Sequence, residues 1–309
     1  MKKIILVAGA TGNLGGKIVD ALLKNGAEVR VIVRRETNQE RITKLEQKGV
    51  KIFMVDTNNK SQIVNACVDV DCVVSALAGL RDVIIDAQKT LLEAAIEAKV
   101  PRFIPSDYST DFTNLIDGQN RNLDLRREFH THLVNAPIRA TTIFNGAFMD
   151  LLTAEMPLIL YKFRRILYWG NPTVKMDLTT TFNIAEFTAN VALDENTPRY
   201  LRIAGDSVNA TDVQKIMTDI TGLKFGMFNP GSIGLFNTII KMAKFFNKGS
   251  NELYPAWQGM QYMRDMMEGR AVIKSHDNDR YKNIRWTSVK EFLISENVKL
   301  SMINPTRTL

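Results

Sequence analysis

The first 150 residues alternate short apolar runs with longer segments whose apolar residues recur at helical spacing. This alternation is typical of βαβ units, in which helices join parallel strands. Ile18, Leu22 and Leu23, for example, predict an amphipathic helix after the first strand. The candidate strands are Lys3–Ala8, Glu28–Val33, Lys51–Val55, Cys72–Ser75, Arg102–Ile104 and Ala140–Phe144. We therefore expect an α/β fold with a Rossmann-type, doubly wound parallel sheet.

The regular alternation fades near Met149 into a more mixed pattern. A strand is predicted at Tyr200–Ala204, and helices are predicted near Ile184–Leu193, Thr211–Thr221 and Phe236–Phe246. We expect a dinucleotide-binding domain over residues 1–150 and a smaller C-terminal α/β substrate lobe over 151–309, some segments of which return to the first sheet. Because open α/β sheets bind ligands beyond the carboxyl ends of their strands, the substrate is expected between the two parts.

The run AGATGNLGGK places Gly9, Gly12 and Gly15 three residues apart, directly after the first apolar strand and before an amphipathic helix. Glycines at this spacing allow a tight turn, leave bare backbone for a pyrophosphate, and let the helix approach the sheet closely. The helix N-terminus then faces the phosphates, where its free N–H groups favour an anion. The strand, turn and helix context makes this a dinucleotide-binding motif.

The end of the second strand indicates which dinucleotide binds. NAD enzymes usually place a carboxylate there to hydrogen-bond the ribose hydroxyls, whereas this strand ends in Arg34 and Arg35. A guanidinium is suited to the 2′-phosphate of NADP(H), which is the cofactor we expect. The alternative is that both arginines form a solvated strand end and that Glu36 serves NAD.

Composition narrows the function classes. Lys and Arg total 40 against 33 for Asp and Glu, a net charge of +7, but no basic block concentrates that charge, so we expect no nucleic-acid partner. Two Cys and three His lack zinc-site spacing, which predicts no metal. No segment has 18 uncharged apolar residues, and the apolar N-terminus is too short for a signal peptide, so we expect a cytoplasmic protein without a membrane partner.

Several motifs together resemble the NmrA-like atypical short-chain reductases, the group that includes plant isoflavone, pinoresinol and phenylcoumaran benzylic ether reductases. The resemblance rests on GATGNLGGKIV, VIVRR, AKVPRFIPSDYSTDF and ATTIFNGAF within the first 150 residues. Beyond them, TTTFNIAEFTANVAL and YLRIAGD are similar to a later helix and strand of the family. The glycine turn alone is shared by many reductases, so the resemblance depends on the combination.

The resemblance implies a set of cofactor contacts. The glycine turn would line the pyrophosphate, Arg34 would hold the 2′-phosphate, one loop would pass beneath the adenosine and ribose, and two later loops would flank the nicotinamide. The implied residues are, in that order, Gly9, Thr11, Gly12, Asn13 and Leu14; Arg34; Ser75, Ala76 and Leu77; and Pro105, Ser106, Asn145 and Phe148.

The catalytic group is harder to assign. Ordinary short-chain dehydrogenases use a Tyr with a Lys four residues on, and no Tyr here has that partner. The resembling plant reductases rely instead on a Lys on the helix before the sixth strand, a position that falls on or beside Arg126. Arg can polarise a carbonyl but is a poor proton donor at neutral pH. His130, Asp107 and Tyr108 are the further candidates, with a solvated helix face and a structural His as the alternatives.

The run Trp257, Met260, Gln261, Met263, Arg264 and Met267 has helical spacing. Its alternatives are a core stripe or a wall of the substrate cleft, in which Trp257, Met260 and Gln261 would contact a flat hydrophobic substrate. The leading hypothesis is an NADPH-dependent reductase of a small hydrophobic or aromatic carbonyl-type compound. A non-catalytic NADP(H) sensor acting through a protein partner is the second hypothesis, and a sugar-nucleotide epimerase or dehydratase is the third.

Overall fold

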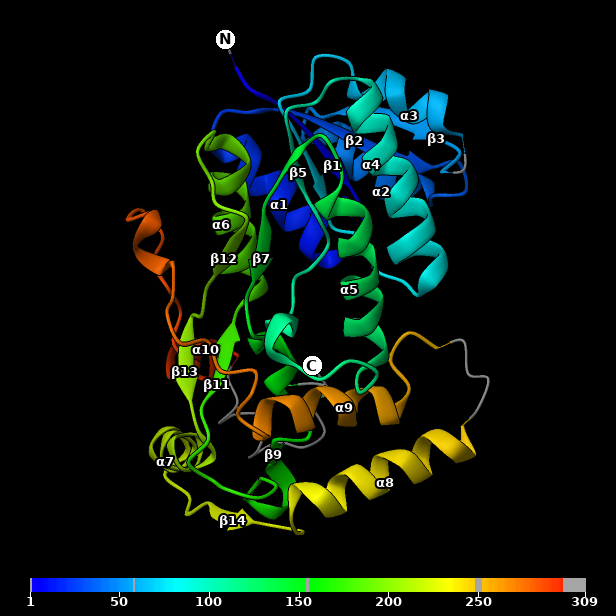
Figure 1. Cartoon of the computed structure of the whole chain (residues 1–309). Coiled ribbons are helices and arrows are strands. Elements are labelled where there is room, and N and C mark those ends of the chain that lie inside the picture. Colours follow the sequence, from blue (N-terminus) through cyan, green and yellow to red (C-terminus); the bar gives the residue numbers. More distant parts are fainter. Residues whose placement is uncertain (1, 58, 154–155, 248–251, 297–309) are drawn as a thin grey trace.

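The computed structural model describes residues 2–57, 59–153, 156–247 and 252–296. Its main sheet has six parallel strands in the order β3-β2-β1-β4-β5-β6 (Figure 1). These strands are β1 (Ile4–Ala8), β2 (Glu28–Arg34), β3 (Lys51–Val55), β4 (Cys72–Ser75), β5 (Arg102–Ile104) and β6 (Arg139–Ala140). The predicted doubly wound sheet is confirmed, and its strand order reverses between β1 and β4, where open α/β sheets bind ligands.

Helices cover both faces of this sheet, because the side chains of each strand point alternately to opposite sides. Ile5 and Val7 of β1 face a core shared with α1 and α6, whereas Leu6 and Ala8 face a core shared with α3, α4 and α5. The helices are α1 (Asn13–Lys24), α2 (Gln39–Gln47), α3 (Lys60–Cys67), α4 (Gln88–Glu97), α5 (Arg121–Val134) and α6 (Thr181–Leu193), with a π-helical turn at Asp82–Ala87 before α4.

The predicted strand Ala140–Phe144 is divided at Thr141, so β6 is followed by a separate strand, β7 (Thr142–Phe144). At this break β7 leaves the main sheet and pairs in parallel with β12 (Tyr200–Arg202) from the second half of the chain. Helix α6, also from the second half, packs along α1. Segments from the second half of the chain therefore lie against the first half, which contains the six-stranded sheet and is called the nucleotide half below. The division at residue 150 stays a prediction.

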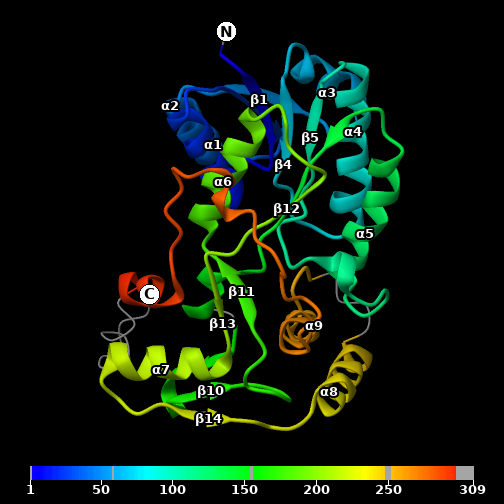
Figure 2. The same ribbon diagram turned by 60° about the vertical axis from the view of Figure 1, so that its left-hand side comes forward.

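The rest of the second half builds its own core from side chains such as Leu178, Val213 and Phe292. Two small sheets, in the orders β14-β10-β9 and β13-β11-β8, pack here with helices at the end of the molecule away from the main sheet (Figures 1 and 2). Their strands are β8 (Ala147–Phe148), β9 (Ile159–Leu160), β10 (Arg165–Leu167), β11 (Met176–Thr179), β13 (Asp206–Val208) and β14 (Gly226–Phe228). The helices are α7 (Ala210–Thr221), α8 (Ile233–Phe246), α9 (Ala256–Met267) and α10 (Val289–Ser295), and short 3-10 turns lie at Phe112–Asn114, Met149–Thr153, Tyr161–Phe163 and Asn278–Arg280. Among the described residues, no helix is both long and apolar enough to cross a bilayer.

Candidate functional site

The turn between β1 and α1 lies directly on the loop that follows β4. Gly9 has φ +84°, and a Cβ atom there would stand 2.4 Å from the carbonyl oxygen of Ala76. A Cβ on Gly15 would stand 2.1 Å from the carbonyl oxygen of Gly9. Neither position can take a side chain without moving backbone, so the glycines bring β1, α1 and the β4 loop together at the switch point.

The N-terminus of α1 is prepared for an anion. Helices such as α2 and α5 begin with Asn38 and Asn120, whose side chains accept a hydrogen bond from the first turn, but α1 begins with Gly12 and has neither a side-chain cap nor an acidic residue in its first turn. The N–H groups of that turn, in the segment of Thr11, Asn13 and Leu14, therefore face outward to a ligand.

Lys17 adds a positive charge beside this turn. Its Nζ donates to Asn13 Oδ1 at 2.6 Å and to Thr181 Oγ1 at 2.7 Å. Thr181 in turn donates to both carboxylate oxygens of Asp150 through its hydroxyl and its N–H. Lys17 is not among the predicted site residues, although its place four residues after Asn13 puts both on one side of the helix.

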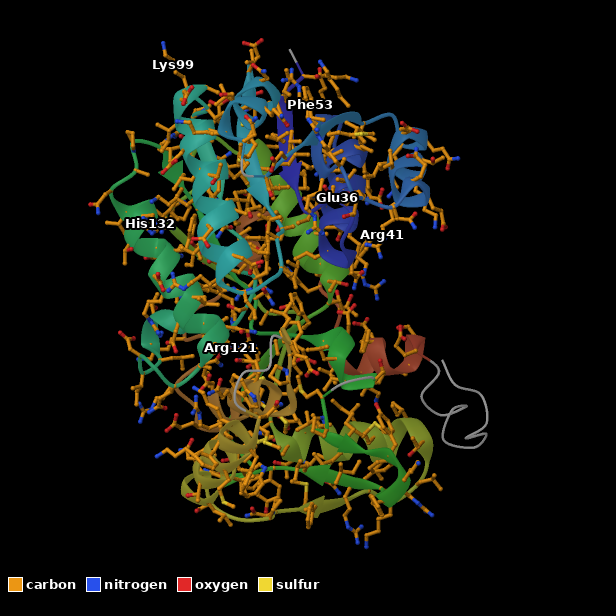
Figure 3. All side chains as sticks on the ribbon, turned by 90° about the vertical axis from the view of Figure 1, so that its right-hand side faces the viewer. Glu36, Arg41, Phe53, Lys99, Arg121 and His132 are labelled. Carbon is orange, nitrogen blue, oxygen red and sulfur yellow. The ribbon has the colours of Figure 1, made fainter. Side chains whose placement is uncertain are left out.

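The second strand ends in exposed charges. Arg34 is the last residue of β2, and Arg35 and Glu36 follow it in a turn, all three exposed. Figure 3 shows Glu36 and Arg41, which is in the first turns of α2, on one flank of the nucleotide half. The side chains of Arg34, Arg35 and Glu36 are thus all available at the edge where an adenosine ribose would lie. This geometry suits either NADP(H), through the arginines, or NAD, through the carboxylate.

The loops after β4 and β5 are fastened to each other. Ser106 donates its hydroxyl to the carbonyl oxygen of Leu77 at 2.6 Å, and its N–H to Gln88 Oε1 at 2.9 Å. Gln88 is fully buried at the start of α4 and donates its own amide to Ile84. These bonds hold two segments side by side: the one with Ser75, Ala76 and Leu77, and the one with Pro105 and Ser106. Gln88 carried no sequence signal beyond a polar residue in an apolar helix.

Arg126 lies against this pair of loops. Its Nε donates to the carbonyl oxygen of Ser106 at 3.1 Å, and its Nη1 donates to that of Asn122 at 2.9 Å. Its side chain is almost fully buried. Because a guanidinium has five N–H donors and Nη2 takes part in neither bond, donors remain for an oxygen of a ligand. The structure thus brings Arg126 and Ser106 together, while the catalytic role of Arg126 stays a prediction.

Tyr262 of α9 is a titratable neighbour of Arg126 that the sequence analysis overlooked. Its ring packs against Phe112, Leu123 and Phe144. Burial raises the pKa of Tyr262 to about 12, and the positive charge of Arg126 acts in the opposite direction. The Tyr–Lys spacing of four residues does not reveal Tyr262, because its positively charged neighbour, Arg126, is on α5 and far away in the sequence.

Asp107 and His130 form a buried network one turn further along α5 from Arg126. Asp107 Oδ2 lies 2.6 Å from His130 Nε2 and accepts from the hydroxyl of Thr142 at 2.8 Å. Arg199 donates to the same hydroxyl at 2.8 Å, and the ring of His130 stacks on Tyr200. These contacts join α5 to β7 and β12, so both residues have structural partners.

Tyr108 is separated from Arg126. Its side chain lies in the core shared with α1 and α6, whereas α5 packs on the opposite face through Phe129 and Leu133. Burial raises the pKa of the Tyr108 phenol well above its usual range. The structure therefore does not bring Tyr108 to the same place as Arg126 and Ser106.

The loop after β7 contributes a buried acceptor. Asn145 is fully buried. Its side-chain Nδ2 donates to the carbonyl oxygen of Gly146 at 3.1 Å, and its main-chain carbonyl oxygen accepts from the Thr179 hydroxyl at 2.7 Å. Asn145 Oδ1 and the hydroxyl of Ser75 have no hydrogen-bond partner among the residues that the structure describes. Buried polar atoms without partners are uncommon and suit a ligand that supplies the missing bonds. Phe148 of β8 is half-buried nearby in the sequence.

The helical run that begins at Trp257 attaches α9 to the start of α5. Gln258 donates to Asn120 Oδ1 at 2.8 Å, and Gln261 Oε1 accepts the N–H of Arg121 at 3.2 Å. The Arg121 guanidinium also lies 4.7 Å from the ring of Trp257, at the junction seen in Figure 3. Met260 packs against the second core. These contacts favour the core alternative for Trp257, Met260 and Gln261, and their contact with a substrate stays a prediction.

Within residues 2–57, 59–153, 156–247 and 252–296, no three His, Cys, Asp or Glu side chains are grouped as metal ligands would be. Cys67 and Cys72 are buried free thiols, and burial raises the pKa of Cys67 to about 12 and that of Cys72 to about 11. Their thiolate forms are strongly disfavoured, so neither is an activated nucleophile.

Known proteins resemble this chain over nearly its whole length. The model of the NmrA-like family matches residues 1–293. Pinoresinol reductase 1 of Arabidopsis thaliana is 29% identical over 234 residues, which cover 71% of this chain and 72% of that protein. Isoflavone reductase of Glycine max is 23% identical over 319 residues, which cover 94% and 98% of the two chains.

A solved structure of AtPrR2 with NADP+ and (+)pinoresinol has a similar fold. It superposes with a TM-score of 0.81 at 22% identity, covering 95% of this chain and 98% of the other. This agreement extends to both halves of the molecule, so the arrangement of the second half on the parallel sheet is common to the two folds.

Proposed function

Because this chain belongs to the NmrA-like family, we propose that it is a reductase that transfers hydride from NADPH to a small hydrophobic or aromatic carbonyl-type substrate. One observation carries the proposal. The glycine turn at Gly9 and Gly15 lies directly on Ala76 in the loop after β4. The next residue of that loop, Leu77, accepts a hydrogen bond from Ser106, and Ser106 in turn accepts one from Arg126. A phosphate cradle and a buried cation therefore lie along one edge of the sheet.

The residues present fit NADP(H). The uncapped N-terminus of α1 and Lys17 suit the pyrophosphate, and Arg34 at the end of β2 suits the 2′-phosphate. The unpartnered oxygens of Ser75 and Asn145 suit the donors of a bound nucleotide. The names of relatives agree with this assignment, since one solved neighbour contains NADP+.

When bound, NADPH supplies the hydride, and the protein must handle the negative charge that develops on the substrate oxygen. Arg126 is held by Ser106 and Asn122, so its remaining N–H donors are fixed in place to receive that oxygen. Tyr262, whose pKa of about 12 keeps it protonated at neutral pH, is the candidate proton donor. Tyr262 would give its proton to the substrate oxygen, and the Arg126 charge would stabilise the phenolate that remains until solvent reprotonates it.

An aromatic substrate is favoured by the surroundings of this cation. Tyr262 presents an aromatic ring beside it. Phe148 of β8 packs instead against the core shared with α1 and α6. The relatives named pinoresinol reductase and isoflavone reductase point to the same class of compound.

The test is Arg126→Ala against Arg127→Ala. Arg127 is the next residue on the helix, but it pairs with Asp117 and Asp124 instead of contacting Ser106. Loss of a fixed donor to a developing oxyanion should lower turnover of an aromatic carbonyl or quinone by about 100-fold, with NADPH affinity nearly unchanged. Arg127→Ala should retain turnover. Equal turnover in wild type and Arg126→Ala would remove Arg126 from the reaction.

A second candidate function is a non-catalytic NADP(H) sensor that acts through a protein partner. It is favoured by the two main-chain bonds of Arg126, which suit a residue that only braces the Ser106 loop. A protein that binds NADPH but reduces no member of a broad carbonyl and quinone panel, and whose Arg126→Ala variant loses only stability or partner binding, would be this sensor.

A further inference from the structure

The end of the molecule farthest from the parallel sheet carries an exposed face that the proposed reaction does not use. Strand β14 and helix α8 lie at this end in both views (Figures 1 and 2), and β10 pairs with β14. Four large apolar side chains are exposed on these elements and on the turn before β10: Phe246 by 80%, Phe163 by 74%, Met242 by 56% and Leu235 by 48%. We call these four residues, together with Lys162, Lys224 and Lys241, the distal face.

Helix α8 has two apolar stripes, one buried and one exposed. It buries Phe236 and Ile240 against the second core, as a surface helix should. Leu235, Met242 and Phe246, however, recur after seven and four residues and so form a second apolar stripe that faces solvent. Contiguous exposed apolar surface of this kind marks an interaction site.

Two segments that build this end of the molecule carry only positive charges. No Asp or Glu occurs in residues 156–176 or 222–247, the segments that contain β9, β10, β14 and α8. The same segments contain Lys162, Arg164, Arg165, Lys175, Lys224, Lys241 and Lys244. Among these, Lys175 pairs with Asp212 of α7, and Lys162, Lys224 and Lys241 are exposed. The distal face therefore combines aromatic side chains with lysines that have no ion pair among the residues that the structure describes.

This combination selects the kind of partner. A second copy of the chain bound about a two-fold axis would place the same basic surface against itself, with like charges opposed. An anionic phospholipid surface satisfies both properties, because phenylalanine and methionine enter the interface while lysines remain at the phosphate level. We propose that the distal face docks this protein on anionic bilayers as a peripheral protein, with α8 lying in the plane of the interface.

The sequence contains no segment long and apolar enough to span a bilayer, which is why no membrane partner is expected from it. Interfacial binding needs no such segment, since a helix of ordinary length with one apolar stripe and flanking lysines suffices. The proposal does not depend on the reductase assignment, because its residues lie on α8, β14 and the turn before β10, away from the glycine turn and Arg126.

The experiment is co-sedimentation of the full chain with phosphatidylcholine vesicles prepared with and without phosphatidylserine. Binding is expected only to the vesicles that contain phosphatidylserine and should weaken as salt is raised. Lys224→Gln and Lys241→Gln should each lower the partition coefficient roughly 5-fold. Phe246→Ser, at an exposed position where folding is not at risk, should lower it by roughly 10-fold or more.

Lys99→Gln and Met54→Ser are the matched controls. Lys99 is exposed at the opposite end of the molecule (Figure 3), and Met54 is an exposed apolar residue on the edge strand β3. Both variants should bind vesicles like the wild type. The proposal is overturned by equal partition to both kinds of vesicle, by equal losses in the controls, or by sedimentation velocity that shows a dimer dispersed by Phe246→Ser, which would assign the face to a second copy.

Discussion

The turn at Gly9 and the cluster around Arg126 lie along the same edge of the sheet but are built in different ways. The turn is made of backbone: Gly9 and Gly15 contact each other and Ala76 through main-chain atoms, so what matters there is that side chains are missing. The cluster is made of side chains from separate segments, Ser106 after β5, Arg126 on α5 and Tyr262 on α9. A site of the first kind tolerates no added atom, whereas a site of the second kind can change its chemistry one residue at a time.

The largest effect is expected for Gly15→Ala. The new Cβ would stand 2.1 Å from the Gly9 carbonyl oxygen, so the turn must move away from α1. We expect the free energy of unfolding to fall by about 3 kcal/mol, the cost of severe overpacking, and NADPH binding to be lost. Urea unfolding and calorimetric titration with NADPH measure the two effects.

Gly259→Ala is the control for this substitution. Gly259 lies inside α9 with open space around its Cα, so alanine there should stabilise the protein by about 0.5 to 1 kcal/mol. If Gly15→Ala binds NADPH as tightly as Gly259→Ala does, the turn is not a backbone-defined phosphate cradle.

The next effect concerns the cofactor at the open end of β2. A charge-assisted contact to phosphate contributes ~1.5–3 kcal/mol, so Arg34→Ala should weaken NADPH binding by roughly 10- to 150-fold and leave NADH binding nearly unchanged. Arg35→Ala tests whether the following arginine in the turn shares this role. Equal affinity of the wild type for NADH and NADPH would favour Glu36 as the residue that contacts the ribose.

The same contrast explains what sequence could predict. The strands Lys51–Val55, Cys72–Ser75 and Arg102–Ile104 have the predicted bounds, because a buried parallel strand is a local apolar run that ends at turn residues. The break at Thr141 was not predicted, since it depends on pairing of β7 with the distant strand β12.

The candidate site divides in the same way. The glycine turn follows from residues within one short segment, and its close packing on Ala76 follows from the strand order. Tyr262 could not be found, because its approach to Arg126 depends on how Gln258 and Gln261 dock α9 on α5. Sequence spacing within one helix does not contain that information.

Asp107→Asn should have a moderate effect on stability and none on the chemistry. Asp107 Oδ2 accepts from Thr142 and pairs with His130, and the amide oxygen of asparagine can take over these contacts only without the negative charge that strengthens them. We expect a loss of about 1 to 2 kcal/mol in the free energy of unfolding with kcat unchanged. Asp117→Asn, an exposed partner of Arg127, should change stability by less than about 0.5 kcal/mol. A collapse of kcat in folded Asp107→Asn would return the Asp107–His130 pair to the catalytic candidates.

The smallest effect is a pH dependence at the junction of α5 and α9. Asp265 accepts from Asn120 Nδ2 at 2.7 Å and from Arg264 Nε at 2.9 Å, yet burial outweighs these contacts and raises the pKa of its carboxyl. Because the folded-state pKa is the higher one, the contribution of this group is fully present below the unfolded value and is lost as pH rises through the folded value. Asp265→Asn should therefore gain stability relative to the wild type as pH is raised from about 4 to 7, as measured by urea unfolding across that range.

Asp212 provides the control of opposite sign. A hydrogen bond from Lys175 lowers the pKa of the Asp212 carboxyl, so its contribution is present above the unfolded value and is lost as pH falls. Asp212→Asn should therefore lose stability relative to the wild type as pH is raised over the same range. Parallel pH profiles for the two variants would show that burial does not govern the pKa of Asp265, and that the hydrogen bond from Asn120 and the positive charge of Arg264 keep its carboxyl ionised instead.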